Sequence, residues 1–132
     1  MTLRNDVTKT VIVTGGNAGL GYACASTIAA ANQGWHIIVA SRDASRGATA
    51  VQQLRRDTGV PTIDAMTLDL ASLASVRAFT DAFRARALPP LQAIVCNAGT
   101  QVLRGTSYTS DGFETTFGVN HLGHFLLVNL LL

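Results

Sequence analysis

The chain has 132 residues, which suffices for one domain with a buried core. Apolar residues make up 48% and charged residues 14%, which excludes a disordered chain and suits a mostly buried parallel sheet. The net charge is only +2 and the arginines are scattered, so we expect no nucleic-acid partner.

The chain opens on a pattern typical of a dinucleotide pyrophosphate site. Residues 10–14 predict a buried strand, a turn with the spacing T-G-x3-G-x-G follows, and a small-residue helix is expected over 19–32. The glycines let the backbone turn tightly and approach a ligand, while the helix directs its unpaired N–H groups at phosphate. The glycines alone are also compatible with a flexible turn. The predicted binding residues are Thr14, Gly15, Asn17, Gly19, Leu20 and Gly21.

Strand and helix patterns alternate through the rest of the chain. Strands are expected over 35–40, 62–67 and 91–96, with helices over 44–57 and from the capping Ser72 to the prolines at 89–90. Right-handed crossovers then give a parallel sheet with strand order 3-2-1-4. We therefore predict an α/β, doubly wound, Rossmann-type fold that contains its first mononucleotide-binding half and part of the second.

A last helix is predicted to begin at an Asp-x-x-Glu capping pattern formed by Asp111 and Glu114. Gly118 and Gly123 weaken that helix, which predicts close packing against a neighbour. The helix has no glycine, proline or basic stop signal before the chain ends. We therefore expect residues 1–132 to be a single dinucleotide-binding domain that is incomplete at its C-terminus.

The end of the second strand is expected to distinguish the nicotinamide cofactors. Ser41 and Arg42 could hold a 2′-phosphate through charge-assisted hydrogen bonds, which favours NADP(H) over NAD. The alternative is that Arg42 is a solvated loop residue. Asp43 could serve NAD, but its position favours a cap on the following helix.

The ends of the third and fourth strands supply further candidates. Asp69 could accept the adenine amino group and Leu70 line an apolar pocket, the alternative being an N-cap aspartate. Asn97 can tie neighbouring strand ends together, and Gly99 removes bulk beside a cofactor. Without other context, the segment Asn97-Ala98-Gly99 is ordinary turn material.

These segments together resemble the short-chain dehydrogenase/reductase family, over essentially the whole chain. The stretches 68–73, 111–114 and 119–127 look most like the branch of retinol dehydrogenases and protochlorophyllide reductases. The resemblance implies hydride transfer between NADP(H) and a carbonyl or alcohol of an apolar substrate. It also implies that the glycine motif, Arg42, Asp69 and Asn97 contact or shape the cofactor site. Asn120 would be the asparagine of an Asn-Ser-Tyr-Lys catalytic group.

Two departures from the family pattern stand out. Cys96 replaces the first asparagine of an Asn-Asn-Ala-Gly motif, and we expect it to be a small buried group, not a nucleophile. The chain also lacks a Tyr-x3-Lys pair, because four residues after Tyr22 and Tyr108 stand a serine and a glycine. The 132 residues alone are therefore expected to be inactive.

The last helix carries two further candidates. On a helical wheel Asn120 shares a stripe with apolar residues and His124, so apart from the family it would be a satisfied core amide. That stripe consists of Phe113, Phe117, Asn120, His124, Leu127 and Leu131. His121 and His124 have no third ligand nearby, so no metal site is expected.

The most economical interpretation is the NADP(H)-binding half of an oxidoreductase. The alternative is a catalytically dead nucleotide-binding module with a regulatory or scaffold role. The chain has two cysteines and no disulfide framework, which predicts a reducing, cytoplasmic setting. Residues 1–6 contain no apolar stretch, so no signal peptide is expected. The apolar run over 125–132 is far shorter than the roughly 20 residues of a membrane span. Self-association is expected through an open sheet edge.

Overall fold

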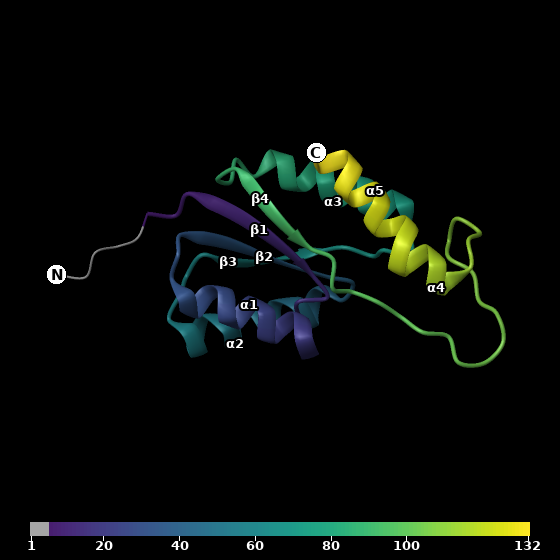
Figure 1. The fold of residues 1–132 in the computed structure, drawn as a ribbon, viewed down its shortest axis with the longest axis horizontal. Helices are drawn as coiled ribbons and strands as arrows, with labels where there is room; N and C mark the ends of the chain where they lie inside the picture. The colour runs from purple at the N-terminus through teal and green to yellow at the C-terminus, as the bar shows by residue number, and fades with distance from the viewer. Residues whose placement is uncertain (1–5) are drawn as a thin grey trace.

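The computed structural model describes residues 6–132, so residues 1–5 of the segment used against a signal peptide lie outside the described part. Four parallel strands form one sheet in the order β3-β2-β1-β4, which confirms the predicted fold class. Helices α1 and α2 cover one face, and α3 and α5 cover the other (Figure 1). The elements are β1 Lys9–Thr14, α1 Gly19–Ala31, β2 Trp35–Ser41, α2 Ala44–Thr58, β3 Ile63–Thr67, α3 Leu73–Ala85, β4 Leu91–Val95, α4 Thr115–Phe117, the π-helical η1 Gly118–Gly123 and α5 His124–Leu131.

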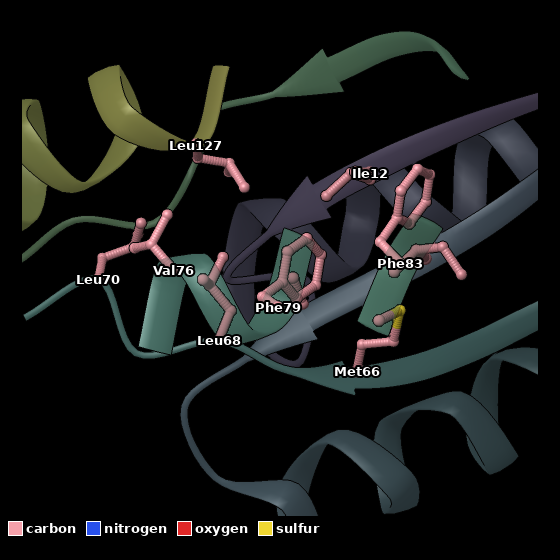
Figure 2. Packing of buried hydrophobic residues seen from close by; sticks show 10 residues of the cluster. Ile12, Met66, Leu68, Leu70, Val76, Phe79, Phe83 and Leu127 are labelled. Atoms are coloured by element: carbon pink, nitrogen blue, oxygen red, sulfur yellow. The ribbon is translucent and has the colours of Figure 1, made fainter. Parts of the chain in front are cut away.

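The central strands β1 and β2 are buried on both faces because helices pack on each side of the sheet. Successive residues of β1 alternate between two apolar clusters, with Ile12 in one and Val11 and Val13 in the other. Figure 2 shows the cluster under α3 and α5, where Phe79 and Leu127 approach the sheet. The alternation follows from the two-residue period of a strand, which points neighbouring side chains to opposite faces.

The predicted caps of α2 and α3 are confirmed. The Arg46 N–H donates to Asp43 Oδ1 at 3.0 Å, and the Ser75 N–H donates to Ser72 Oγ at 3.2 Å. Each bond satisfies a backbone donor that the first turn of a helix leaves without a partner.

The predicted Asp111–Glu114 capping pair is only half right. Glu114 caps α4, since its carboxylate accepts from Thr116 N at 3.0 Å and Phe117 N at 2.8 Å. Asp111 instead accepts from Leu73 N at 2.8 Å, at the start of α3. The loop before α4 folds back onto α3, so this carboxylate serves a helix 38 residues earlier.

The final helix contains a π segment that the sequence pattern does not predict. Its two glycines are five residues apart, the separation that a π-type hydrogen bond joins, and both are buried. A Cβ on Gly118 would lie 2.5 Å from Thr109 Cγ2, and one on Gly123 would lie 2.6 Å from the Leu70 carbonyl oxygen. The expectation that close packing explains these glycines is confirmed.

None of the helices in residues 6–132 combines the length and the apolarity that crossing a bilayer requires.

Candidate nucleotide-binding site

A cavity of about 300 Å³ opens where the carboxyl ends of the strands meet. This is the edge at which open parallel sheets bind ligands. Most of the residues predicted to bind the cofactor surround it. The lining includes the predicted Thr14, Gly15, Asn17, Ser41, Arg42, Asp69, Leu70, Ala98 and Gly99, together with Ala40, Asp43, Arg46, Leu68, Ala71, Thr100, Thr115 and Val119.

The glycine-rich loop follows β1 and begins the cavity. Gly15 and Gly19 have φ of +64° and +55°, a conformation that side chains disfavour. Gly21 is buried, and a Cβ on it would lie 2.3 Å from the Gly15 carbonyl oxygen. Gly15 and Gly19 therefore allow the chain to turn, and Gly21 allows α1 to pack closely against the loop.

Four predicted residues lie outside the lining. Gly19 and Leu20 are exposed, and the Leu20 side chain is 84% exposed. Gly21 and Asn97 support the loop from behind, where Asn97 Nδ2 donates to the Thr14 carbonyl at 3.1 Å and to the Gly15 carbonyl at 3.4 Å. The prediction that Asn97 ties neighbouring strand ends together is thus confirmed.

The N-terminus of α1 differs from that of the helices next to it. Its N-cap is Ala18, which offers no side-chain acceptor, and its first turn carries no acidic residue. The N-termini of α2 and α3 are each capped by a side chain. The first amides of α1, beside the glycine-rich loop, are therefore left for an external acceptor such as phosphate.

The other end of the cavity is formed by the tip of β2. Arg42 is exposed, and Asp43 is occupied as the cap of α2, as the sequence favoured. Ser41 is buried and its hydroxyl donates to the Asp43 carbonyl at 3.2 Å. Arg46 also lines the cavity, and the sequence analysis missed it. The signal available in the sequence was its position in the first turn of the helix predicted over 44–57, close to Arg42 at the end of the preceding strand.

Asp69 does not cap α3, so that alternative is wrong. Its Oδ1 accepts from Ala71 N at 2.9 Å in a local turn, while its own N–H donates to Ser75 Oγ at 2.9 Å. The cap of α3 is Ser72. Among the described residues Oδ2 has no hydrogen-bond partner, so one oxygen of this half-buried carboxylate is left for a ligand in the cavity.

Cys96 is exposed, so its predicted burial is wrong. It follows β4, which borders the sheet, and this edge position accounts for the exposure. Partial desolvation nevertheless raises the pKa of the Cys96 thiol. The thiol form therefore predominates at neutral pH, which disfavours a nucleophilic role.

Asn120 is exposed, so it is not the core amide that the helical wheel allowed. Phe113 lies in the loop before α4 and is 42% exposed, and Phe117 at the end of α4 is 52% exposed, so the predicted stripe is not one continuous buried face. The π segment that follows then interrupts the 3.6-residue period of the helix. The Asn120 amide pairs with both backbone groups of Thr100: Oδ1 accepts from the Thr100 N–H at 2.8 Å, and Nδ2 donates to the Thr100 carbonyl at 2.9 Å. It lies beside Gly99, 3.4 Å from where a Cβ would stand, but outside the cavity lining.

The two histidines of the last helix lie in different environments. His121 is exposed, and its ring lies between Phe117 and Phe125 at centroid distances of 5.3 Å and 6.1 Å. His124 is buried, and its Nε2 lies 2.8 Å from Thr14 Oγ1. Sequence analysis did not foresee that contact, which joins residues 110 positions apart.

A parallel sheet of order 3-2-1-4, with a glycine-rich loop and an uncapped helix at the carboxyl end of its central strand, defines a Rossmann-type nucleotide-binding protein. Residues 9–132 match the family described as short chain dehydrogenase. The chain belongs to this family.

Relatives and solved structures agree with this assignment. The chain is 48% identical to the human WW domain-containing oxidoreductase over 123 residues, covering 93% of this chain and 29% of that protein. It is 47% identical to the chloroplastic protochlorophyllide reductase A of Oryza sativa subsp. japonica over 133 residues, covering 99% and 33%. A short-chain dehydrogenase from Sphingobium yanoikuyae in complex with NADPH superposes with a TM-score of 0.72 at 26% identity, over 93% of this chain and 47% of that one. The chain thus spans about a third of the length of these curated relatives.

Proposed function

We propose that this chain is the NADP(H)-binding half of a short-chain dehydrogenase/reductase whose substrate is an apolar carbonyl or alcohol. The observation that carries the proposal is a single cavity lined by the glycine-rich loop at one end and by Arg42 and Arg46 at the other. When bound, NADP(H) would supply or accept the hydride. The NADPH complex of the similar Sphingobium yanoikuyae enzyme supports this choice of cofactor.

The charges around the cavity favour a phosphorylated ribose. Arg42 and Arg46 are the cationic residues of its lining, and Asp43 is engaged by the amide of α2. An unengaged acidic residue at this position would repel a 2′-phosphate, whereas a guanidinium can donate paired hydrogen bonds to it. We therefore propose NADP(H) as the preferred cofactor and NAD(H) as the weaker ligand.

Neither tyrosine of the chain is placed for the family's proton transfer. Tyr22 donates to Asp57 Oδ2 at 3.3 Å between α1 and α2, and burial followed by the charge of Asp57 raises its pKa. Tyr108 is 68% exposed in the loop before α4. Neither residue lines the cavity. We propose that these 132 residues bind the cofactor without turning it over.

Calorimetric titration of the chain with NADPH and NADH tests the cofactor assignment. We expect saturable binding of one equivalent of NADPH, and at least tenfold weaker binding of NADH. Equal affinities would remove the case for a 2′-phosphate site, and binding of neither nucleotide would overturn the proposed function.

A catalytically dead regulatory module is the second candidate, since the cavity lies within the 132 residues and neither of their tyrosines lines it. The reading frame beyond codon 132 distinguishes the two. A continuation that encodes Tyr-x3-Lys supports the enzyme, and a stop codon supports the module.

A further inference from the structure

His124 connects the final helix to the edge of the nucleotide cavity. It is buried, with 6% of its surface exposed, although an imidazole is polar. Its Nε2 lies 2.8 Å from Thr14 Oγ1, and its Nδ1 lies 3.3 Å from the Asn120 carbonyl oxygen. The ring therefore bridges the last residue of β1 and the π segment.

The hydrogen bonds of Thr14 determine which nitrogen carries the proton. Thr14 Oγ1 accepts from Asn97 N and from Ala98 N, each at 3.0 Å, and these two bonds use both lone pairs of the hydroxyl. The hydroxyl proton of Thr14 is then the one part of the group that can still form a hydrogen bond. His124 Nε2 at 2.8 Å is a nearer acceptor for that proton than the Val95 carbonyl at 3.3 Å. His124 Nε2 is thus the acceptor, and Nδ1–H donates to the Asn120 carbonyl.

We propose that His124 is a positioning residue of the nucleotide site, acting as a neutral imidazole in the Nδ1–H form. By accepting the hydrogen bond that the Thr14 hydroxyl donates, it orients that hydroxyl so that both lone pairs face the backbone after β4. The glycine-rich loop is thereby held to the strand end beside Ala98 and Gly99. The inference rests on the proposed function, since it concerns the same NADP(H) site.

Protonation of His124 breaks this arrangement. A proton on Nε2 would point at an oxygen with no free lone pair, so the contact with Thr14 would be lost. Burial lowers the pKa of His124, and the hydrogen bond to the Asn120 carbonyl opposes this only in part. Within the described residues no charged side chain is among the causes of the shift. The titratable groups of the surrounding elements are Arg77, Asp81 and Arg84 on α3, Lys9 at the far end of β1, Cys96 after β4, Asp69 before α3 and His121 on η1.

The first experiment identifies the protonated nitrogen. Long-range proton–nitrogen NMR of the ¹⁵N-labelled chain at pH 7.5 should show His124 neutral, with its proton on Nδ1. A charged ring or the Nε2–H form would overturn the inference without any cofactor being added.

The second experiment measures NADPH affinity between pH 4.5 and pH 8, a range that extends well below the ordinary histidine pKa because the pKa of His124 is lowered. We expect His124→Leu to weaken NADPH about tenfold at pH 7.5, because Thr14 loses its acceptor. His124→Gln retains an acceptor near the Nε2 position but does not titrate, so it should restore much of the affinity. Between pH 7.5 and pH 4.5 the wild type should lose several-fold more affinity than His124→Gln.

Two controls separate this effect from others. The 2′-phosphate of NADPH is a phosphomonoester and itself titrates at about pH 6. Its titration contributes equally to the profile of every variant, so it cancels in the comparison. His121→Leu removes an exposed histidine of the same helix and should follow the wild-type profile. A wild type whose pH profile matches that of His124→Gln would overturn this inference alone. A wild type that binds neither nucleotide would overturn the proposed function, and this inference with it.

Discussion

Two arginines four residues apart in the sequence line the β2 end of the cavity, and the proposal of NADP(H) rests on them. Arg42 lies in the turn after β2, and Arg46 lies in the first turn of α2. Asp43 between them is 4.0 Å from Arg46 Nε, an exposed and weak ion pair that leaves the guanidinium available. At the scale of the residue, we therefore expect cofactor preference to depend on whether each charged side chain is already engaged by a neighbour or is available to the ligand.

Removing the first of these guanidiniums should affect one cofactor only. A hydrogen bond to a charged group contributes about 1.5–3 kcal/mol, so Arg42→Ala should weaken NADPH by tens-fold while sparing NADH. Titration calorimetry with both nucleotides measures this. Arg104→Ala, an exposed arginine outside the cavity lining, should change neither. Equal losses for the two nucleotides would reject the 2′-phosphate role.

Asp69 should act on the part common to both cofactors. Its Oδ1 accepts from Ala71 N, a bond that an asparagine oxygen can preserve. We propose that Oδ2 accepts from the adenine amino group. Asp69→Asn should therefore weaken NADPH and NADH similarly, by several-fold, with little change in melting temperature. Unchanged binding with a lower melting temperature would show that this carboxylate is structural only.

At the scale of the element, the last helix is defined by its packing more than by its propensity. The π turn allows Gly118 and Gly123 to approach Thr109 and Leu70 closely, and it moves Asn120 out of the apolar stripe. Asn120 is thereby placed on the backbone of Thr100, next to the cavity. The π segment thus determines the position of the residue that resembles the family's catalytic asparagine.

The N-terminus of α3 depends on a carboxylate from the distant loop. Loss of a capping acceptor costs about 1 kcal/mol, so Asp111→Ala should lower the free energy of unfolding by about that amount. Asp111→Asn retains an oxygen acceptor and should lose less. Asp81→Ala, an exposed acidic residue on α3 itself, is the matched control for urea denaturation. Equal values for Asp111→Ala and Asp81→Ala would contradict the cap.

The N-terminus of α4 should make stability sensitive to acid. Hydrogen bonds from the Phe117 and Thr116 amides lower the pKa of Glu114 below its usual 4.5. The folded state therefore binds the proton less readily than the unfolded state, so this contribution is present above pH 4.5 and is lost as pH falls through the lower, folded value. Glu114→Gln should flatten that part of the stability profile in thermal melts from pH 3 to pH 7. If the stability profile of Glu114→Gln matched that of the wild type, the acid sensitivity would come from other residues.

At the scale of the whole molecule, the described structure leaves a strand edge and an apolar helix stripe uncovered. Strand β4 borders the sheet, and the residues from 115 to 132 include no charged side chain. Phe117 and Phe125 on that segment are 52% and 59% exposed. An open strand edge and an exposed apolar stripe both favour association between chains.

The 132-residue chain should therefore self-associate in solution. Light scattering should show oligomers at micromolar concentration, and the double variant Phe117→Glu with Phe125→Glu should reduce them by introducing charge into the stripe. A monodisperse monomeric wild type would contradict this expectation.

The same chain should show no NADPH oxidation above background with apolar aldehydes. General acid catalysis contributes about 10²–10⁴ in rate, and neither tyrosine lies in the cavity to provide it. Spectrophotometric assay of the purified chain measures the rate. Turnover that Asn120→Ala abolishes would show that another group replaces the missing phenol.

Much of the architecture was predictable from local pattern alone. Alternating strands and helices imply parallel pairing, and the handedness of crossovers then orders the strands. The spacing from Thr14 to Gly21 predicted where the chain turns toward a ligand, because a left-handed turn and a close helix contact each require glycine. These features depend on neighbours a few residues apart, so the sequence by itself determined them.

The remaining features depend on contacts between distant segments, and only the tertiary structure decided them. A helical wheel assumes 3.6 residues per turn, so it misplaced Asn120 across a π turn that packing produces. A capping motif does not specify which helix its carboxylate will reach, and Asp111 reaches α3. The bond between Thr14 and His124 joins residues 110 positions apart, and no local period encodes such a pair. Its formation required the sheet and the last helix to bring both side chains into one buried space, where each polar group needs a partner.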